Sequence, residues 1–390
     1  MYSNSYLNLT NLKLIPLLFV FIAYIIENFN TTYSFIFKLS SIALMIFFII
    51  IERSYNKKIL ALTIGLLILF LINLINPYNY NAAFESLIKF LFIPVILLYA
   101  IILKKNFYQI AKIIIFFALL SNIMYLYNAL NFFLNIGPQI IEYRTKDSGY
   151  LFNAGLFDVS NAVLQFTAFI IVYEFDRTKL RVYKLSFFFI LTLLTFSYKT
   201  LPFLFLYIFF KAKYKQRIYL LIFLIVFSVF LSEYIFNMYE VLNYKISVYL
   251  IDGGSARYES YRVMFTTLFE GNFFGMGLGT FGGPESIKYN SPLYEYYKFD
   301  WGWMDFLKTT DTSYPHLFVE LGLVGGVILL SLIYLSVNTI YNYTKEIKEA
   351  TNLLLYSFLF SSIFSYGLFN LLELSIVFLS FISMRYHAQN

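Results

Sequence analysis

Long apolar runs recur along this 390-residue chain, and they limit its possible folds more than any other feature. Each run approaches the roughly 20 apolar residues that one helix needs to cross the hydrocarbon core of a bilayer. A soluble core has no use for so many runs, and the strands of a membrane barrel are shorter and alternate apolar with polar residues. The sequence therefore predicts an all-α integral membrane protein.

We expect a polytopic bundle of about 12 transmembrane helices that forms a single transmembrane domain over residues 1–390. The last two segments meet tightly at Gly367, and a count of about 11 spans is the main alternative. We interpret Leu185–Phe210 as a short hairpin rather than one kinked helix, because the hairpin keeps the basic connector after it in the cytoplasm. The predicted spans are Leu14–Ile26, Tyr33–Ile51, Ile59–Ile75, Leu87–Leu103, Phe107–Tyr127, Val159–Phe175, Leu185–Phe196, Leu201–Phe210, Ile218–Phe236, Leu317–Ile340, Leu353–Tyr366 and Leu368–Met384.

Basic residues lie at the ends of the apolar runs instead of forming a patch on a soluble domain. The net charge of +7 therefore does not indicate a nucleic-acid partner. Short basic connectors stay in the cytoplasm, and here they alternate with connectors that lack Lys and Arg. We therefore predict a multi-pass protein of a bacterial inner membrane with both termini cytoplasmic. The bacterial origin is inferred from the bias towards Phe, Tyr, Ile, Asn and Lys.

Two connectors on the predicted external (periplasmic) face are much longer than hairpin turns, residues 137–158 and residues 237–315. The longer one holds more than half of the chain's 17 glycines and both of its tryptophans, and it is too aromatic for a disordered segment. Within it, Ser260–Glu270 predicts an amphipathic helix that could lie on the membrane surface. The expected apolar side of that helix carries Tyr261, Met264, Phe265, Leu268 and Phe269.

His316 is the strongest candidate for chemistry, because it follows Pro315 and opens a predicted helix at the external boundary of the membrane. A helix N-terminus favours a neutral imidazole, which is the form that a general base needs. Glu320 lies four residues further on the same helix face and could orient the ring. The alternative is an interfacial histidine that hydrogen-bonds a loop carbonyl. No metal site is predicted, since His387 lies at the opposite face and no carboxylate–histidine cluster has ligand spacing.

Arg257, Arg262 and Lys199 are cations predicted near the external interface, and Arg144 is a further candidate of the same kind. Guanidinium groups bind phosphate in a bidentate way, so a lipid-linked diphosphate is a natural ligand. The alternative is ordinary contact with anionic lipid headgroups. Four other charged residues fall in or at the ends of predicted spans, close enough to an end to reach the interface: Lys38, Lys89, Glu233 and Glu373.

Glycines are concentrated between Gly275 and Gly283, and Gly277–Gly282 formally matches the dinucleotide-binding fingerprint. That fingerprint requires a strand before it and a helix after it within a βαβ unit, which an external loop does not offer. We therefore reject a nucleotide site and expect these glycines to allow tight turns and close backbone approach. Gly322 and the pair Gly325–Gly326 are expected to let the next helix pack closely against its neighbours.

The order of these motifs resembles a known family. An arginine, a Gly-x-Gly-x-Gly-x-Phe run and a histidine that opens a helix with Glu-x-Gly-x-x-Gly are similar to bacterial O-antigen polymerases (Wzy type) and O-antigen ligases. Ser197-Tyr-Lys199 resembles that family's Ser-x-Arg/Lys element at the external end of an earlier span. The chain departs from the pattern at Leu317, where Asn is common, and at Arg262, where Trp is common. The matching residues are Arg257, Gly275–Phe281, His316, Glu320, Gly322 and Gly325.

The resemblance implies a glycosyltransferase without metal or other cofactor, which uses a glycan linked to undecaprenyl diphosphate. In a polymerase the growing glycan moves onto a new lipid-linked repeat unit; in a ligase it moves onto lipid A–core. We expect the polymerase, which makes O-antigen or another surface polysaccharide. The partners would be the lipid-linked glycan, membrane lipids and a chain-length regulator (a polysaccharide co-polymerase).

The resemblance also implies roles for single residues. Arg257 and Lys199 would hold the diphosphate leaving group, with Arg262 and Arg144 as further cations. His316 would activate or orient the acceptor hydroxyl, with Glu320 as the third catalytic candidate. Aromatic side chains would stack on sugar, and the candidates are Trp301 and Trp303.

A transporter or lipid-oligosaccharide flippase is the main rival from another class, since it also has about 12 spans. Such a protein is expected to place polar residues and broken helices at the bilayer midplane, whereas the spans here are nearly free of charge at their centres. A membrane scaffold without catalytic activity would not explain the concentration of glycine and tryptophan in one loop.

Overall fold

The computed structural model describes residues 12–53, 56–134, 137–141, 144–145, 151–152, 155–195, 197, 200–212, 247, 255–302, 309–339 and 344–389. Most of the described chain is helical, and strands β1 and β2 form only a two-residue antiparallel ladder. The elements are α2 (Ile15–Glu27), α3 (Thr31–Glu52), α4 (Lys57–Asn73), α5 (Tyr80–Leu103), α6 (Phe107–Leu134), β1 (Arg144–Thr145), β2 (Leu151–Phe152), η1 (Asp158–Ser160), α7 (Asn161–Phe175), α8 (Arg181–Leu194), α9 (Leu201–Lys211), α12 (Ala256–Phe269), α13 (Pro284–Lys288), α14 (Pro292–Tyr296), α15 (Ser313–Val337), α16 (Lys345–Ser361), η3 (Gly367–Phe369) and α17 (Leu371–Gln389).

The helices confirm the expected class, a helical membrane protein. Five of the described helices, α3, α5, α6, α15 and α17, are long and apolar enough to cross a membrane, and α2, α7 and α9 are shorter apolar helices. The count of about 12 spans is not confirmed. Each predicted span that falls within the described residues coincides with a helix, whereas Ile218–Phe236 lies outside them.

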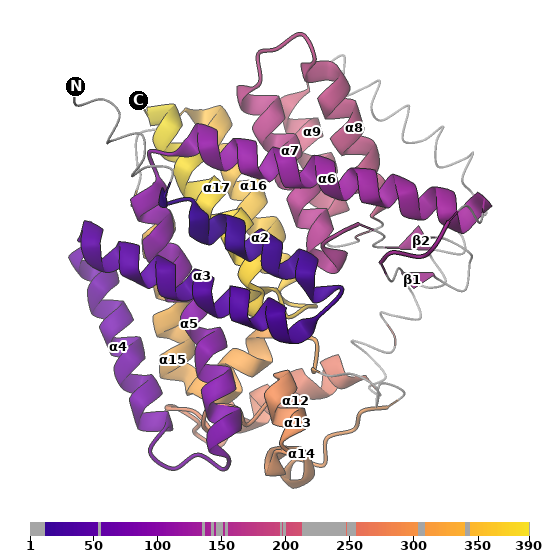
Figure 1. Ribbon diagram of the computed structural model, residues 1–390. Helices are drawn as coiled ribbons and strands as arrows, with labels where there is room; N and C mark the ends of the chain where they lie inside the picture. The colour runs from indigo at the N-terminus through magenta and orange to yellow at the C-terminus, as the bar shows by residue number, and fades with distance from the viewer. Residues whose placement is uncertain are drawn as a thin grey trace.

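Helix α17 is the centre of the molecule (Figure 1). It contacts α2, α5, α6, α7 and α16, and all residues from Leu371 to Arg385 are buried. A helix with apolar residues on every face is enclosed by protein or by lipid, and here neighbouring helices enclose it. Helices α4, α5 and α15 lie side by side, and α12, α13 and α14 are gathered at one end of that group (Figure 1).

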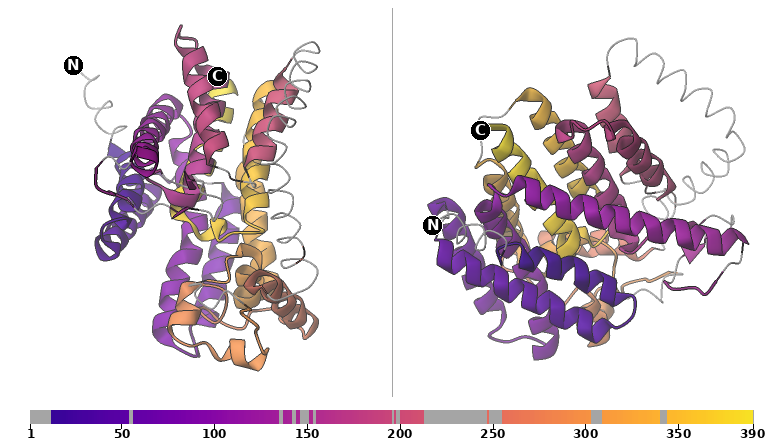
Figure 2. Two further views of the ribbon diagram at one scale, coloured as in Figure 1. Left: turned by 90° about the vertical axis from the view of Figure 1, so that its right-hand side faces the viewer. Right: turned by 45° about the horizontal axis from the view of Figure 1, so that its top comes forward.

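The helices do not form one parallel bundle. Helices α2 and α3 form a hairpin that crosses α5, and α6 runs across α7 and α17 (Figures 1 and 2). The predicted hairpin near residue 200 is confirmed, because the rings of Phe189 in α8 and Phe205 in α9 lie 6.4 Å apart. In a continuous helix these two rings would be about 24 Å apart along the axis.

A break within α15 sets the geometry of the end where α12–α14 lie. Gly322 has φ 67° and ψ −173°, a conformation that is essentially restricted to glycine. The break leaves backbone groups on both sides without helical partners. The expected role in close helix packing is therefore not the one that Gly322 has. Gly325 has that role, because a Cβ on Gly325 would meet the Leu69 side chain of α4 at 2.6 Å.

Residues 271–283, the glycine loop, supply the missing partners. The amides of Met276 and Gly277 donate to the carbonyls of Val319 (2.9 Å) and Glu320 (3.3 Å). In return, the amides of Leu323 (3.1 Å) and Val324 (2.9 Å) donate to loop carbonyls. The expected close backbone approach is confirmed, since a Cβ on Gly275 would collide with the backbone at residue 320. The loop therefore pairs with α15 much as a strand would.

We predict that Gly322→Ala lowers the free energy of unfolding by at least about 2 kcal/mol, because alanine is strained in this conformation and its Cβ would collide with Gly275 and Phe273. Thermal unfolding in detergent measures the effect. The matched control is Gly65→Ala in α4, where nothing lies within 4 Å of the new methyl group and stability should be unchanged or higher. Equal melting temperatures for the two variants would contradict the role of the break.

Candidate functional site

Glu320 anchors the glycine loop from inside the molecule. Its side chain is fully buried on α15, one turn after His316. Oε1 accepts a hydrogen bond from the Phe281 amide (2.9 Å), and Oε2 accepts from the Gly279 amide (2.9 Å) and from the Ser86 hydroxyl of α5 (2.6 Å). The carboxylate thus joins the loop to two long helices, so most of its hydrogen-bonding capacity serves the fold.

His316 lies in the first turns of α15, which begins at Ser313 and not at the histidine itself. Its ring is fully buried and stacks on Tyr366, with centroids 5.2 Å apart and an interplanar angle of 13°. Phe90 and Phe369 pack on the ring at 5.1 Å and 4.5 Å. The loop approaches from the remaining side, where a Cβ on Gly282 would meet the His316 Cβ at 2.8 Å.

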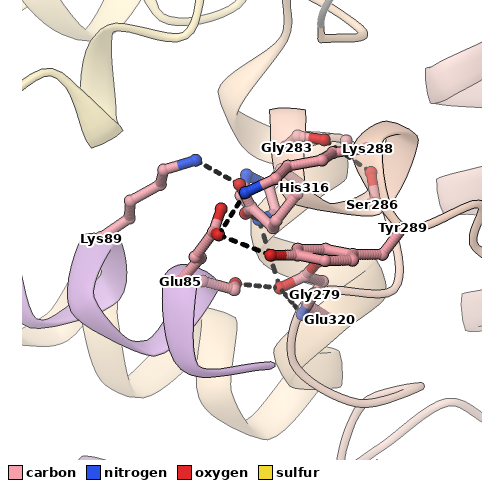
Figure 3. A network of polar contacts seen from close by, with 12 residues as sticks. Glu85, Lys89, Gly279, Gly283, Ser286, Lys288, Tyr289, His316 and Glu320 are labelled. Carbon is pink, nitrogen blue, oxygen red and sulfur yellow. Dashed lines mark hydrogen bonds and ion pairs between the residues drawn. The ribbon is translucent and has the colours of Figure 1, made fainter. Parts of the chain in front are cut away.

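Two carboxylates face the imidazole. His316 Nε2 is 3.2 Å from Glu320 Oε2 and 3.8 Å from Glu285 Oε1, and all three side chains have no exposed surface. The other oxygen of Glu285 pairs with the Lys89 ammonium, which is 21% exposed. We refer to Lys89, Glu285, His316 and Glu320 as the His316 cluster. Figure 3 shows it where α5, the loop and α15 meet.

The cluster contains buried polar atoms that have no hydrogen-bond partner among the described residues. They are both ring nitrogens of His316, Glu285 Oε1 and the Tyr366 hydroxyl oxygen. Buried polar groups in proteins are nearly always paired, so a concentration of unpaired ones indicates a place where a polar ligand or water binds.

The cluster also has the spacing of a cation site. One ligand atom each from Glu285, His316 and Glu320 lie within 4.8 Å of one another. We expected no metal because no such cluster was visible along the sequence, and that reason is wrong. The fold brings Glu285 of α13 to two α15 residues that lie about 30 residues further along the chain.

Helix α13 is fixed over the cluster by two reciprocal ion pairs with α5. Lys89 of α5 pairs with Glu285 of α13, and Glu85 of α5 pairs with Lys288 of α13 at 2.7 Å. The first pair is largely buried, whereas the side chains of the second are 36% and 58% exposed. The Tyr289 hydroxyl also donates to Glu85 (2.9 Å). Figure 3 shows Glu85 and Lys89 reaching from α5 to this segment.

The two arginines predicted to bind diphosphate are both engaged with carboxylates. Arg257, near the start of α12, pairs with Asp311 just before α15. Arg262 pairs with Glu259 at 2.6 Å and donates to the Tyr297 carbonyl. Arg257 is connected to the His316 region through the loop, because the amide of Thr310, next to Asp311, donates to the Gly282 carbonyl (3.1 Å). Arg262 lies one turn further along α12.

The remaining predicted site residues are described in part. Lys199 and Trp303 lie outside the described residues, and Arg144 is described only as part of β1. Trp301 packs on Phe299 (4.7 Å) and Tyr294 (5.2 Å), in a small aromatic core between α12 and α15.

The helix expected at 260–270 is confirmed as part of α12, but its apolar and polar residues do not separate onto two faces. Phe265 and Phe269 are exposed, whereas Glu259, Ser260, Val263, Met264 and Thr267 are buried.

Sequence reasoning found His316 and Glu320 but missed Glu285 and Ser86, and it interpreted Lys89 as an interfacial charge. One signal was present: Glu285 follows the Gly-Gly-Pro turn directly, so its side chain has a defined position. Nothing in the sequence places Lys89 beside it. Comparison of the chain with protein-family models, curated proteins and solved structures finds no match.

We predict that Glu320→Gln destabilises the protein by about 2–3 kcal/mol, because the amide group turns donors towards the loop amides and leaves buried groups unpaired. Ser86→Ala removes a single hydrogen bond to the same carboxylate and should cost about 1–2 kcal/mol. Thermal unfolding and limited proteolysis of the loop measure both effects. A Glu320→Gln protein as stable as Ser86→Ala would contradict the anchoring role.

The two ion pairs of α13 should differ in strength. Lys89→Ala leaves Glu285 buried without a counter-charge and should cost about 3 kcal/mol. Lys288→Ala breaks an exposed pair and should cost less than about 1 kcal/mol. Unfolding of the two variants under identical conditions, each compared with the wild type, gives the comparison. If Lys288→Ala is the more destabilising change, the buried pair does not hold α13.

Proposed function

We propose that this chain is a glycosyltransferase that polymerises lipid-linked oligosaccharide repeat units into O-antigen or another surface polysaccharide. The observation that carries the proposal is the His316 cluster, in which a buried imidazole with unpaired nitrogens faces two carboxylates. Such groupings are typical of sites where protons are transferred. The resemblance to O-antigen polymerases supplies the substrate class, a glycan on undecaprenyl diphosphate.

The proposed glycosyl transfer needs a base and cations. The acceptor hydroxyl of a new repeat unit forms a bond to C1 of the donor sugar, while the bond from C1 to the diphosphate breaks and its electron pair leaves with the diphosphate. A base must take the hydroxyl proton, and cations must stabilise the negative charge on the leaving group. His316 and its carboxylates provide the first function, and the arginines of α12 provide the second.

Binding of a diphosphate requires these arginines to exchange partners. Arg257 would have to give up Asp311, and Arg262 would have to give up Glu259. A diphosphate carries more charge than one carboxylate and matches the guanidinium fork, which favours the exchange. Trp301 and Trp303 remain the proposed sugar-stacking residues, and Lys199 and Arg144 remain additional cations.

The proposal includes a topology. About 12 spans with both termini in the cytoplasm would place residues 237–315 on the outer face of a bacterial inner membrane. The His316 cluster would then lie near the outer leaflet, where a lipid-linked donor presents its diphosphate. A chain-length regulator is the expected protein partner, and no cofactor is required for this chemistry.

Two alternatives remain. An O-antigen ligase would use the same residues to transfer the polymer to lipid A–core. A flippase is favoured by one observation, the broken helix α15, because transporters often place broken helices at their binding sites. Against it, backbone groups on both sides of the break are paired with the glycine loop, whereas the broken helices of transporters leave theirs for the substrate or ion.

A deletion strain separates these functions. Surface polysaccharide reduced to one repeat unit on core indicates the polymerase, and full-length polymer accumulating on the lipid carrier indicates the ligase. Repeat units trapped on the cytoplasmic side indicate the flippase. Gel banding of the polysaccharide distinguishes the polymerase from the ligase. Binding of a glycan-specific lectin to intact spheroplasts identifies the flippase, because the lectin reaches only the repeat units on the outer face.

We predict that His316→Ala abolishes polymer extension in the complemented deletion strain while the protein level in the membrane is unchanged, since the acceptor hydroxyl loses its partner. The matched control is His387→Ala in α17. That histidine stacks on Phe107 at the other end of the molecule, and its loss should leave the banding intact (Figure 1). Full-length polymer from His316→Ala would refute the assigned role.

A further inference from the structure

The two carboxylates of the His316 cluster are not equivalent. Both oxygens of Glu320 already accept hydrogen bonds from the loop amides or from Ser86. Glu285 pairs through one oxygen with Lys89, and its Oε1 is buried without a hydrogen-bond partner among the described residues. Glu285 therefore retains the capacity to accept a proton or a hydrogen bond from a ligand.

Glu285 Oε1 and His316 Nε2 are close enough for one hydroxyl oxygen to reach both. The two atoms are 3.8 Å apart. A single oxygen atom can therefore lie about 2.8 Å from both atoms, which is a normal hydrogen-bond length. A hydroxyl offers one proton and lone pairs, so it donates to the carboxylate and accepts from an Nε2–H.

A divalent cation fits the same spacing less well chemically. Its other carboxylate ligand, Glu320, already accepts three hydrogen bonds, and the ion would lie close to the positive charge of Lys89. Lys89 already balances one of the two carboxylate charges, so only one negative charge remains to face a divalent cation. A neutral hydroxyl satisfies the unpaired atoms without adding positive charge beside the ammonium.

We propose that Glu285, rather than Glu320, is the proton acceptor that works with His316, and that the two hold the acceptor hydroxyl between them. This inference depends on the proposed function. As the acceptor oxygen bonds to C1 of the donor, its proton passes to Glu285 Oε1, and the bonding pair of the broken C1–O bond leaves with the diphosphate. His316 orients the hydroxyl through Nε2–H, and Lys89 is a positioning residue that holds Glu285.

The hydroxyl would approach from the side of Lys89. Within the cluster, Lys89 is the member with exposed surface, 21%, whereas Glu285, His316 and Glu320 have none. Helix α13 carries Glu285 and is fixed to α5 by the exposed pair of Glu85 and Lys288 in addition to the buried one. Release of the exposed pair costs little, so the Lys288 end of α13 can move to admit a sugar while the buried pair keeps Glu285 in place.

The test uses the full-length protein in proteoliposomes, with lipid-linked repeat units extracted from the deletion strain as both donor and acceptor. Glu285→Gln keeps the shape of the side chain but cannot take the proton. We expect its turnover to fall by about 100-fold or more with a small change in KM. Glu285→Asp should recover part of the rate. The matched control Glu295→Gln, an exposed carboxylate on α14, should match the wild type.

The outcomes are distinct. If the wild type is active and Glu285→Gln keeps more than half of its rate, this inference is wrong and the proposed function stands. A wild type that makes no polymer overturns both. Elemental analysis and a high-resolution map of the purified protein provide a readout that does not depend on turnover. Density for one water between Glu285 and His316 supports the inference, whereas an empty gap or one bound divalent metal per chain that is lost in Glu285→Gln overturns it.

Discussion

The pairing of the glycine loop with the broken helix α15 is the interaction on which the rest of this site depends. A helix that ends inside a protein leaves backbone donors and acceptors that must find partners, because buried unpaired groups are costly. Here Gly322 opens the helix, and the loop supplies amides and carbonyls to both sides of the break. The break therefore fixes the path of the loop, and the loop in turn carries Glu285 to His316.

Glycine is required in this arrangement for steric reasons. Cβ atoms on Gly275 and Gly279 would collide with the backbone of α15 and α5, respectively. The close approach buries the amides of Gly279 and Phe281, and the Glu320 carboxylate accepts hydrogen bonds from both. The carboxylate is thus stabilised by a chain segment that is distant in sequence. The Glu320 carboxylate thus anchors the loop through hydrogen bonds. Its hydrogen-bonding capacity is thus used by the fold, whereas Glu285 faces the imidazole with an oxygen that has no hydrogen-bond partner among the described residues.

The sequence was sufficient for the parts of the fold that depend on local patterns. Apolar runs predicted the helices, and the spacing of His316 and Glu320 placed both on one face of α15. It was insufficient where partners are distant in sequence, as with Lys89 and Glu285, because nothing in a helical pattern specifies which loop will cover which helix. The mixed polar and apolar character of the buried side of α12 was not visible in the sequence for a related reason: Glu259 is buried together with its ion-pair partner Arg262.

The charges of this end of the molecule also indicate how a substrate must bind. Arg257, Arg262, Lys288 and Lys89 each pair with a carboxylate of another residue. An anionic ligand therefore competes with carboxylates of the protein, and each exchange frees the segment that the carboxylate had held. Loss of the Arg257–Asp311 pair frees the chain just before α15, and loss of the Lys288–Glu85 pair frees α13. The ion pairs around the site are thus the same contacts that an anionic ligand would have to displace.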